Sequence, residues 1–292
     1  ASKFGISQTG AGGTLNVTGT PTGGGASSAR GISATAGILN ITGTPVGGTS
    51  SGAGVYISGA TVAITGDVTG GAGREGAEIA SGTLTISGNA TPYAGASGGG
   101  GLRVSGGTCT LNGTAIGAQL DAVTMSTGGT LTINNAVTGS SSTASKYGVN
   151  CSGGTVTINA NVTGGTAAGG SAHGVNLSSS GVLNVTGNVT SSASGSGYGV
   201  NSTSSGAITV TGNVSANATR GISSSGGGAI TVTGNVTAST TGYGINSTAT
   251  AVITVTGTIT AANGCPGVYC TSASGARVNV HGDMIGDATS GY

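Results

Sequence analysis

Apolar and polar residues alternate along short stretches of this chain, and the same stretch keeps returning. Residues 204–214 read SSGAITVTGNV, and residues 227–236 read GGAITVTGNV. In each copy an aliphatic residue lies two positions before a recurrent glycine, and a second apolar residue lies four positions before it. Thr, Asn or Ser mostly separates the two. A period of two predicts a half-buried β-strand and argues against a helix.

The recurrent position marks twelve copies of a repeat, spaced 22 to 27 residues apart. A second short strand is expected just after it, as at Val68, Val137 and Val214. A third is expected further on, at a glycine followed by an aliphatic residue such as Gly148 and Val149; coil four is assigned Glu78 and Ile79 at this place. The recurrent position is occupied by Gly19, Gly43, Gly66, Gly88, Gly113, Asn135, Ala160, Gly187, Gly212, Gly234, Gly257 and Gly282.

Three short strands with Gly and Ser corners cannot each bury an apolar face alone, but stacked copies can. The repeat therefore predicts an all-β fold, a three-sided parallel β-helix (β-solenoid) of about twelve coils. Residues 1–292 are expected to form a single domain with no separate capping domain. At about 4.8 Å per coil, twelve coils give a rod roughly 58 Å long.

This pattern resembles the right-handed parallel β-helix superfamily, which includes pectate-lyase-like enzymes, phage tailspikes and bacterial surface adhesins. The resemblance covers nearly the whole chain and rests on the periodicity. The resemblance implies a right-handed coil. Within the superfamily, the repeat of this chain most resembles the repeats of bacterial surface adhesins and filament proteins.

Composition narrows the class of protein. Glycine accounts for 64 of 292 residues, but it has no three-residue period and there are 4 prolines, which argues against collagen. The regular aliphatic positions supply a core that a disordered chain lacks. A net charge of +1 offers no basic stripe for nucleic acid. No apolar run is long enough to insert into a membrane.

The chain begins at Ala1 without Met, so we expect a secreted protein whose leader has been removed. Its low charge and its richness in Thr, Ser, Asn and Gly favour an extracellular or cell-surface location. This localisation is an expectation from composition.

Neither end of the sequence carries a predicted cap, and open solenoid ends invite head-to-tail stacking. We therefore expect an extracellular structural protein that assembles with itself, end to end, into a filament. An alternative is a fragment of a surface adhesin whose neighbouring segments supply the caps. The expected subunit junction joins Phe4, Ile6 and Val17 to Val278, Val280 and Met284, with Tyr292 clasping the partner.

Catalysis is not expected from the six acidic residues, which are scattered along the chain. Glu75 and Glu78 lie beside Arg74 and are interpreted as a solvated loop. No Cys or His spacing indicates a metal site, and no cofactor is expected. Cys265 and Cys270 could form a disulfide if Pro266 and Gly267 make a turn; the alternative is that all four cysteines are small buried hydrophobic residues.

Two outward rows offer alternative functions. The first row is the residue just before the third-strand glycine, and it comprises Tyr147, His173, Tyr198, Arg220 and Tyr243. These side chains are predicted to stack along the axis as a ladder that stabilises the fold. Alternatively, they form a glycan-binding strip, which would make the chain a carbohydrate-binding or carbohydrate-cleaving β-helix. The other resembles the Thr-X-Thr face of β-solenoid antifreeze proteins and predicts ice binding through Thr209, Thr211, Thr231, Thr233, Thr254 and Thr256. Thr is also a common strand residue.

Overall fold

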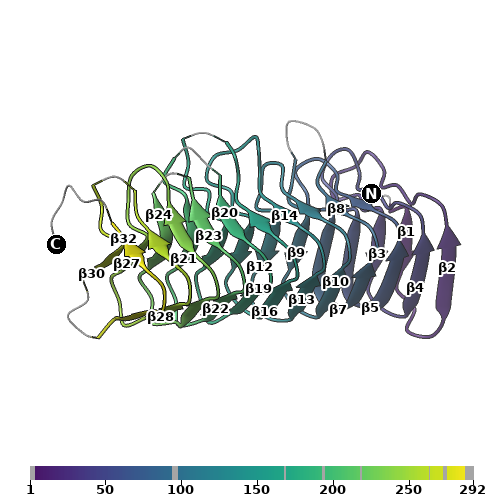
Figure 1. Ribbon diagram of the computed structural model, residues 1–292. Coiled ribbons are helices and arrows are strands. Elements are labelled where there is room, and N and C mark those ends of the chain that lie inside the picture. Colours follow the sequence, from purple (N-terminus) through teal and green to yellow (C-terminus); the bar gives the residue numbers. More distant parts are fainter. Residues whose placement is uncertain are drawn as a thin grey trace.

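The computed structural model describes residues 4–93, 98–167, 169–192, 195–217, 219–262, 264–271 and 275–286. The elements in these ranges are β-strands, and they pair in parallel from one coil to the next. The chain forms an all-β parallel β-solenoid of about 11 turns with about 24 residues per turn (Figure 1). The predicted fold is confirmed, and the three sides and twelve coils are close to what is seen.

The first side of the solenoid carries the strands that contain the third-strand glycine or begin directly after it. Its strands are β1 (Ile6–Gln8), β3 (Ile32–Ala34), β9 (Leu102–Val104), β12 (Val123–Met125), β15 (Val149–Cys151), β18 (Val175–Leu177), β21 (Tyr198–Ser202), β24 (Arg220–Ser224), β27 (Ile245–Ser247) and β30 (Val268–Cys270).

The second side carries the strands with the strongest alternation. Its strands are β2 (Thr14–Thr18), β4 (Ile38–Thr42), β10 (Thr108–Leu111), β13 (Thr130–Ile133), β16 (Thr155–Ile158), β19 (Val182–Val185), β22 (Ala207–Val210), β25 (Ile230–Val232), β28 (Val252–Val255) and β31 (Arg277–Val280). Two long strands, β5 (Val55–Thr65) and β7 (Ala77–Ile86), belong to both the first and the second side.

The third side is a 10-stranded sheet of short strands. It contains β6 (Val68–Thr69), β8 (Ala90–Thr91), β11 (Ala115–Ile116), β14 (Val137–Thr138), β17 (Val162–Thr163), β20 (Val189–Ser191), β23 (Val214–Ala216), β26 (Val236–Ala238), β29 (Ile259–Thr260) and β32 (Met284–Ile285).

The inward rows of the three sides meet in one continuous core. On the second side Leu131 pairs with Val156 and Ile133 with Ile158, and all four are fully buried. Cys109 takes the same inward position one coil earlier and is also buried. Burying one such aliphatic side chain contributes about 1.5 to 3 kcal/mol to the free energy of unfolding, and each repeat buries several of these side chains. Stacked coils therefore share a core that stabilises the fold, whereas a single coil could not bury its apolar face alone.

Close stacking explains why glycine recurs at the corners. Gly43 has a φ of 151°, and a Cβ added there would lie 1.8 Å from the carbonyl oxygen of Gly19 in the preceding coil. A Cβ on Gly199, at the start of the first side, would lie 2.6 Å from Val214 Cγ1. Both glycines are required by the small distance between packed backbones.

The structure corrects the predicted strand pattern in coils three and four. Val55 pairs with Ala77, so the third-strand motif of coil four is Gly76 and Ala77, and Glu78 faces outward instead of opening the motif. In β5 and β7 the first two sides are joined without a break in the strand. The bend falls at Gly59 and Gly82, whose φ angles of 124° and 90° allow the chain to turn, and the pairing of the two strands shifts register there before it resumes at Thr61 and Thr83.

Candidate functional site

Two neighbouring outward rows on the first side form a surface that we call the polar edge. One row is the residue before the third-strand glycine, and the other is the residue two positions after it. The rows read Phe4, Arg30, Ala53, Glu75, Gly100, Asp121, Tyr147, His173, Tyr198, Arg220, Tyr243 and Pro266, and Ser7, Ser33, Tyr56, Glu78, Arg103, Thr124, Asn150, Asn176, Asn201, Ser223, Asn246 and Tyr269.

The polar edge gathers charges and rings in a chain that has few of either. Charged residues make up 4% of the sequence, and there are 7 tyrosines. Six charged residues and five of the tyrosines lie in these two rows. The polar edge is therefore the candidate site.

In the later coils, side chains of the first row stack along the axis as predicted. Tyr147 and His173 lie with ring centroids 4.9 Å apart and an interplanar angle of 5°. His173 and Tyr198 are 4.6 Å apart at 9°. The Arg220 guanidinium carbon lies 5.2 Å from the Tyr198 centroid and 5.9 Å from that of Tyr243. The column contributes stacking and cation–π attraction between successive coils.

The structure adds Tyr269 to this stack, a residue that the sequence pattern missed. Its ring lies 4.6 Å from that of Tyr243 at 9°. Tyr269 belongs to the second row, so a search along one row could not find it. The Tyr243 ring leans across the edge and stacks on the second row of the next coil. We call the six residues Tyr147, His173, Tyr198, Arg220, Tyr243 and Tyr269 the ring column.

Beside the ring column runs a chain of amide hydrogen bonds, the amide row, formed by Asn150, Asn176 and Asn201. Asn201 Nδ2 donates to Asn176 Oδ1 at 2.7 Å, and Asn176 Nδ2 donates to Asn150 Oδ1 at 3.0 Å. Asn150 Nδ2 donates to Asp121 Oδ2 at 3.0 Å. The Asp121 Oδ1 atom accepts the Tyr147 N–H at 2.8 Å. Asp121 thus ends the row, because its two carboxylate oxygens accept these hydrogen bonds and the side chain has no amide group to donate a further one.

Burial shifts the pKa of two residues in this region. His173 is buried, and burial lowers its pKa from 6.5 to about 4, so the ring is neutral near pH 7. Its Nδ1 accepts the Tyr198 N–H at 3.0 Å. Burial also raises the pKa of Asp121 above its ordinary value, opposed by the hydrogen bonds from Tyr147 and Asn150. His173 is therefore a structural neutral ring at this position.

The earlier coils of the polar edge hold charges instead of stacked rings. The Arg30 guanidinium carbon lies 3.6 Å from the Tyr56 centroid, and Arg74 Nη1 pairs with Glu78 Oε1 at 3.1 Å. Glu75 is buried, and burial together with a hydrogen bond to Glu78 raises its pKa from 4.5 to about 7. The predicted solvated loop is therefore wrong for Glu75, because its carboxyl group is turned into the fold.

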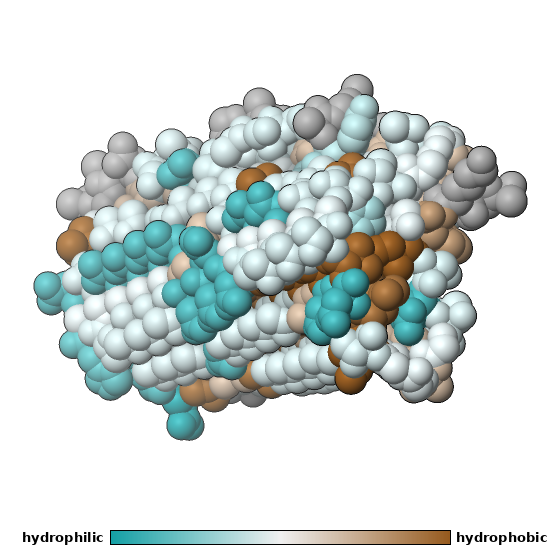
Figure 2. All heavy atoms as spheres, turned by 90° about the vertical axis from the view of Figure 1, so that its right-hand side faces the viewer, coloured by the Kyte–Doolittle hydropathy of each residue, from teal (hydrophilic) through white to brown (hydrophobic). Residues whose placement is uncertain are grey.

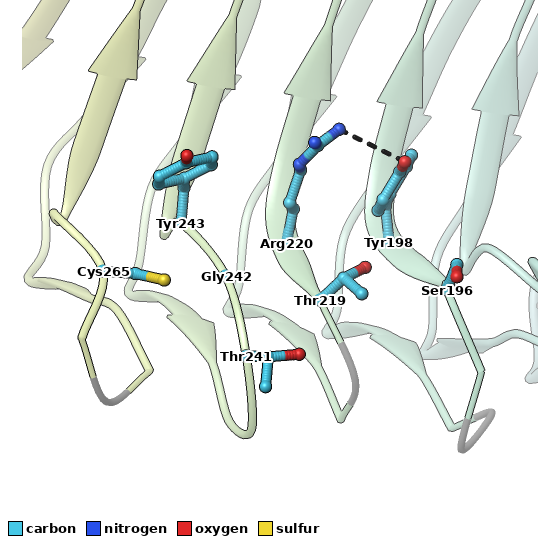
Figure 3. A pocket seen from close by; sticks show the side chains of 8 residues that line it. All are labelled: Ser196, Tyr198, Thr219, Arg220, Thr241, Gly242, Tyr243 and Cys265. Carbon is cyan, nitrogen blue, oxygen red and sulfur yellow. Dashed lines mark hydrogen bonds between the residues drawn. The ribbon is translucent and has the colours of Figure 1, made fainter.

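A cleft opens on the later half of the edge, where the first row meets the loops before it. Its volume is about 360 Å³, and it is lined by Ser196, Tyr198, Thr219, Arg220, Thr241, Gly242, Tyr243 and Cys265. The Arg220 guanidinium lies between the two tyrosines and turns toward Tyr198, whose hydroxyl is 3.2 Å from Nη1 (Figure 3). The cleft thus combines a cation, two rings and three hydroxyl groups.

The residues expected at the subunit junction lie on the outermost described coils. Phe4 is 38% exposed and Met284 63% exposed, while Ile6, Val17, Val278 and Val280 pack partly buried against the core. Tyr292 lies outside the described residues. Seen from the end that carries β2, apolar surface gathers on the solenoid (Figure 2). Apart from Phe4, which belongs to the polar edge, these side chains occupy the same rows as buried residues of the adjacent coils.

The outward rows of the second side, which we call the Thr face, are more regular than the predicted ice face. Thr209, Thr231 and Thr254 stack in register, with Thr211, Thr233 and Thr256 beside them. The sequence pattern missed an earlier block of paired threonines because Asn or Ser follows each pair. That block contains Thr83 and Thr85, Thr108 and Thr110, Thr130 and Thr132, and Thr155 and Thr157.

The cysteines differ from both sequence interpretations. Cys109 and Cys151 are buried as predicted. Cys265 is half-buried and Cys270 is exposed, and both are free thiols, so the possible disulfide is not formed and these two cysteines are not buried hydrophobic residues either. The reason is that Val268–Cys270 is an extended strand. At about 3.3 Å per residue, it carries Cys270 about 10 Å beyond Gly267, out of disulfide reach.

Comparison of the chain with protein-family models, with curated proteins and with solved structures finds no match. Among the described residues, no three His, Cys, Asp or Glu side chains gather closely enough to hold a metal ion. The same residues contain no helix that is long and apolar enough to span a membrane. The resemblance to β-helix proteins therefore extends to the parallel β-solenoid fold and no further.

Proposed function

We propose that this chain is an extracellular structural protein that assembles head to tail with copies of itself into a β-solenoid filament at a cell surface or in a matrix. The observation that carries the proposal is the exposure of core rows on the outermost described coils. Leu15 is 39% exposed and Met284 is 63% exposed, whereas Leu39 and Ile259, one coil further in, are fully buried.

A second copy is the occupant that fits these surfaces. It would continue the aliphatic rows and offer strand edges of the same period to β2 and β31. Such a contact is heterologous and propagates instead of closing. The low charge of the chain also lets identical faces approach without strong repulsion. In the adhesin alternative, a further coil of a longer chain covers the same rows.

Negative-stain electron microscopy of residues 1–292 near neutral pH tests this proposal. We expect thin filaments with an axial repeat of about 53 to 58 Å, the length of 11 to 12 coils at about 4.8 Å each. Leu15→Glu should abolish them by placing a charge in the junction. Ile116→Glu is the matched control, because Ile116 is 37% exposed but lies on the third side. Rods that remain monomeric at high concentration, or filaments formed equally by both variants, would contradict the proposal.

Ice binding is a second candidate, favoured by the paired threonine rows of the Thr face. Thr110 and Thr132 lie in register at the centre of the earlier block. Thermal hysteresis is the test, and Thr110→Leu with Thr132→Leu should remove it. Thr138→Leu, at an exposed position on the third side, should leave it unchanged. A wild-type chain without thermal hysteresis rules this candidate out.

A further inference from the structure

Arg220 is held more loosely than the other arginine that lies on a ring of the polar edge. Its guanidinium carbon is 5.2 Å from the Tyr198 centroid, whereas that of Arg30 is 3.6 Å from the Tyr56 centroid. The hydrogen bonds of its guanidinium, to Tyr198 Oη at 3.2 Å and Ser223 Oγ at 3.5 Å, both come from Nη1. A guanidinium has five N–H donors. Several of them are thus available to a ligand.

The charge of Arg220 is also unbalanced. In the described ranges, the one ion pair joins Arg74 to Glu78. The closest carboxylate along the polar edge is that of Asp121, four coils earlier, or about 19 Å away at the usual strand spacing. That distance exceeds the Debye length of about 8 Å at physiological ionic strength. An anion entering the cleft would therefore meet an uncompensated cation.

The walls of the cleft determine what kind of anion fits. One face of Tyr198 stacks on His173 and one face of Tyr243 stacks on Tyr269, and the other face of each ring is turned toward the Arg220 guanidinium. The hydroxyl groups of Ser196, Thr219 and Thr241 line the side nearer the loops (Figure 3). Hydroxyl groups beside aromatic side chains suit a sugar, which combines C–H groups with a polar rim. The volume of about 360 Å³ is in the range of small-ligand sites.

We propose that this cleft binds a single sugar unit that carries an oxyanion, a carboxylate or a sulfate ester. The oxyanion contacts Arg220, the sugar lies in the cleft beside the guanidinium, and its hydroxyl groups contact Ser196, Thr219 and Thr241. A guanidinium binds such oxyanions with two parallel hydrogen bonds. This binding is independent of filament formation.

Isothermal titration calorimetry of the full chain tests the proposal with three matched probes. Methyl β-glucuronide, the 6-sulfate of methyl β-glucoside, and methyl β-glucoside itself differ only at carbon six. We expect at least one of the charged probes to bind at least about tenfold more tightly than the neutral one, because the neutral probe cannot form charge-assisted hydrogen bonds with Arg220. The preferred charged probe identifies the oxyanion.

Arg220→Gln should weaken binding of the charged probe about tenfold or more. Arg30→Gln is the matched control, since Arg30 lies in the same row but outside the cleft, and it should bind as the wild type does. Thr241→Phe fills the cleft from its exposed rim and should also abolish binding, which keeps the test valid if Arg220→Gln unfolds.

Three outcomes would overturn the proposal. In one, no probe binds. In another, the neutral sugar binds as well as the charged ones, or inorganic sulfate alone binds as well as the sulfated sugar. In the third, Arg220→Gln and Thr241→Phe are both folded and bind like the wild type.

Discussion

Two amide ladders run along this solenoid with almost the same geometry. On the polar edge, the Asn150, Asn176 and Asn201 side chains are joined at 3.0 and 2.7 Å. On the Thr face, those of Asn112, Asn134 and Asn159 are joined at 2.8 and 2.7 Å. Asn176 is buried, whereas all three residues of the second ladder are exposed.

Because they differ in burial, the two ladders should contribute differently to the free energy of unfolding. Water can replace a lost partner for Asn134, but it has little access to the groups around Asn176, where bulky residues of the ring column lie beside the row. A buried polar group without a partner costs about 1 to 3 kcal/mol, whereas an exposed one costs little. Hydrogen-bond length alone therefore does not tell which ladder stabilises the fold.

The largest effect is expected from Asn176→Ala. It removes the partners of both Asn150 Oδ1 and Asn201 Nδ2, so we expect the free energy of unfolding to fall by roughly 4 kcal/mol. Asn134→Ala removes the same number of hydrogen bonds and should cost under about 0.5 kcal/mol. Urea unfolding followed by circular dichroism measures both. Equal losses in the two variants would show that burial is not what separates the ladders.

The second prediction concerns pH and the ring column above the buried ladder. The pKa of His173 is about 4 in the folded chain and about 6.5 when unfolded, so the unfolded state binds more protons between these values. The free energy of unfolding should therefore fall as the pH is lowered from about 6.5 to 4, by about 3 kcal/mol from this residue.

His173→Phe keeps a ring in the stack but cannot titrate. The difference in stability between the variant and the wild type should thus change over this pH window and stay constant above it. Glu75, whose pKa is raised, acts in the opposite sense: its stabilising contribution is lost as the pH rises from 4.5 through about 7. Since both proteins contain Glu75, its effect cancels. A pH-independent difference would contradict the neutral burial of His173.

The smallest effect is expected from extending the buried ladder. Ser223 lies in register between Asn201 and Asn246. In the direction of the row, Ser223→Asn should donate to Asn201 Oδ1 and accept from Asn246 Nδ2, which should raise the free energy of unfolding by about 1 kcal/mol. Ser33→Asn, in the same row but between Ser7 and Tyr56, should give no such gain. A loss of stability in Ser223→Asn alone would argue against an extendable row.

The parts of the fold that follow from a single strand period could be predicted from the sequence. Leu131, Val156 and their equivalents recur at one position, and burial of one such row fixes the whole register. The stacking of Tyr147, His173 and Tyr198 followed for the same reason, because residues in one row lie one strand spacing apart.

Contacts between rows could not be predicted, because they depend on how far and in which direction a side chain leans. Tyr269 meets Tyr243 across the edge, and Glu75 turns inward beside Glu78, although neither shares the other's row. The cleft at Arg220 likewise needs loop residues such as Ser196 and Thr241, whose position relative to the strands has no period.

The direction of the amide row also has a consequence for the order in which the coils form. Each Nδ2 points to the coil that precedes it, and Asp121 is the first acceptor. During synthesis the preceding coil emerges first, so every new asparagine finds its acceptor already in place. We therefore expect the row to favour the addition of coils from the amino-terminal side, in the direction in which the chain is synthesised.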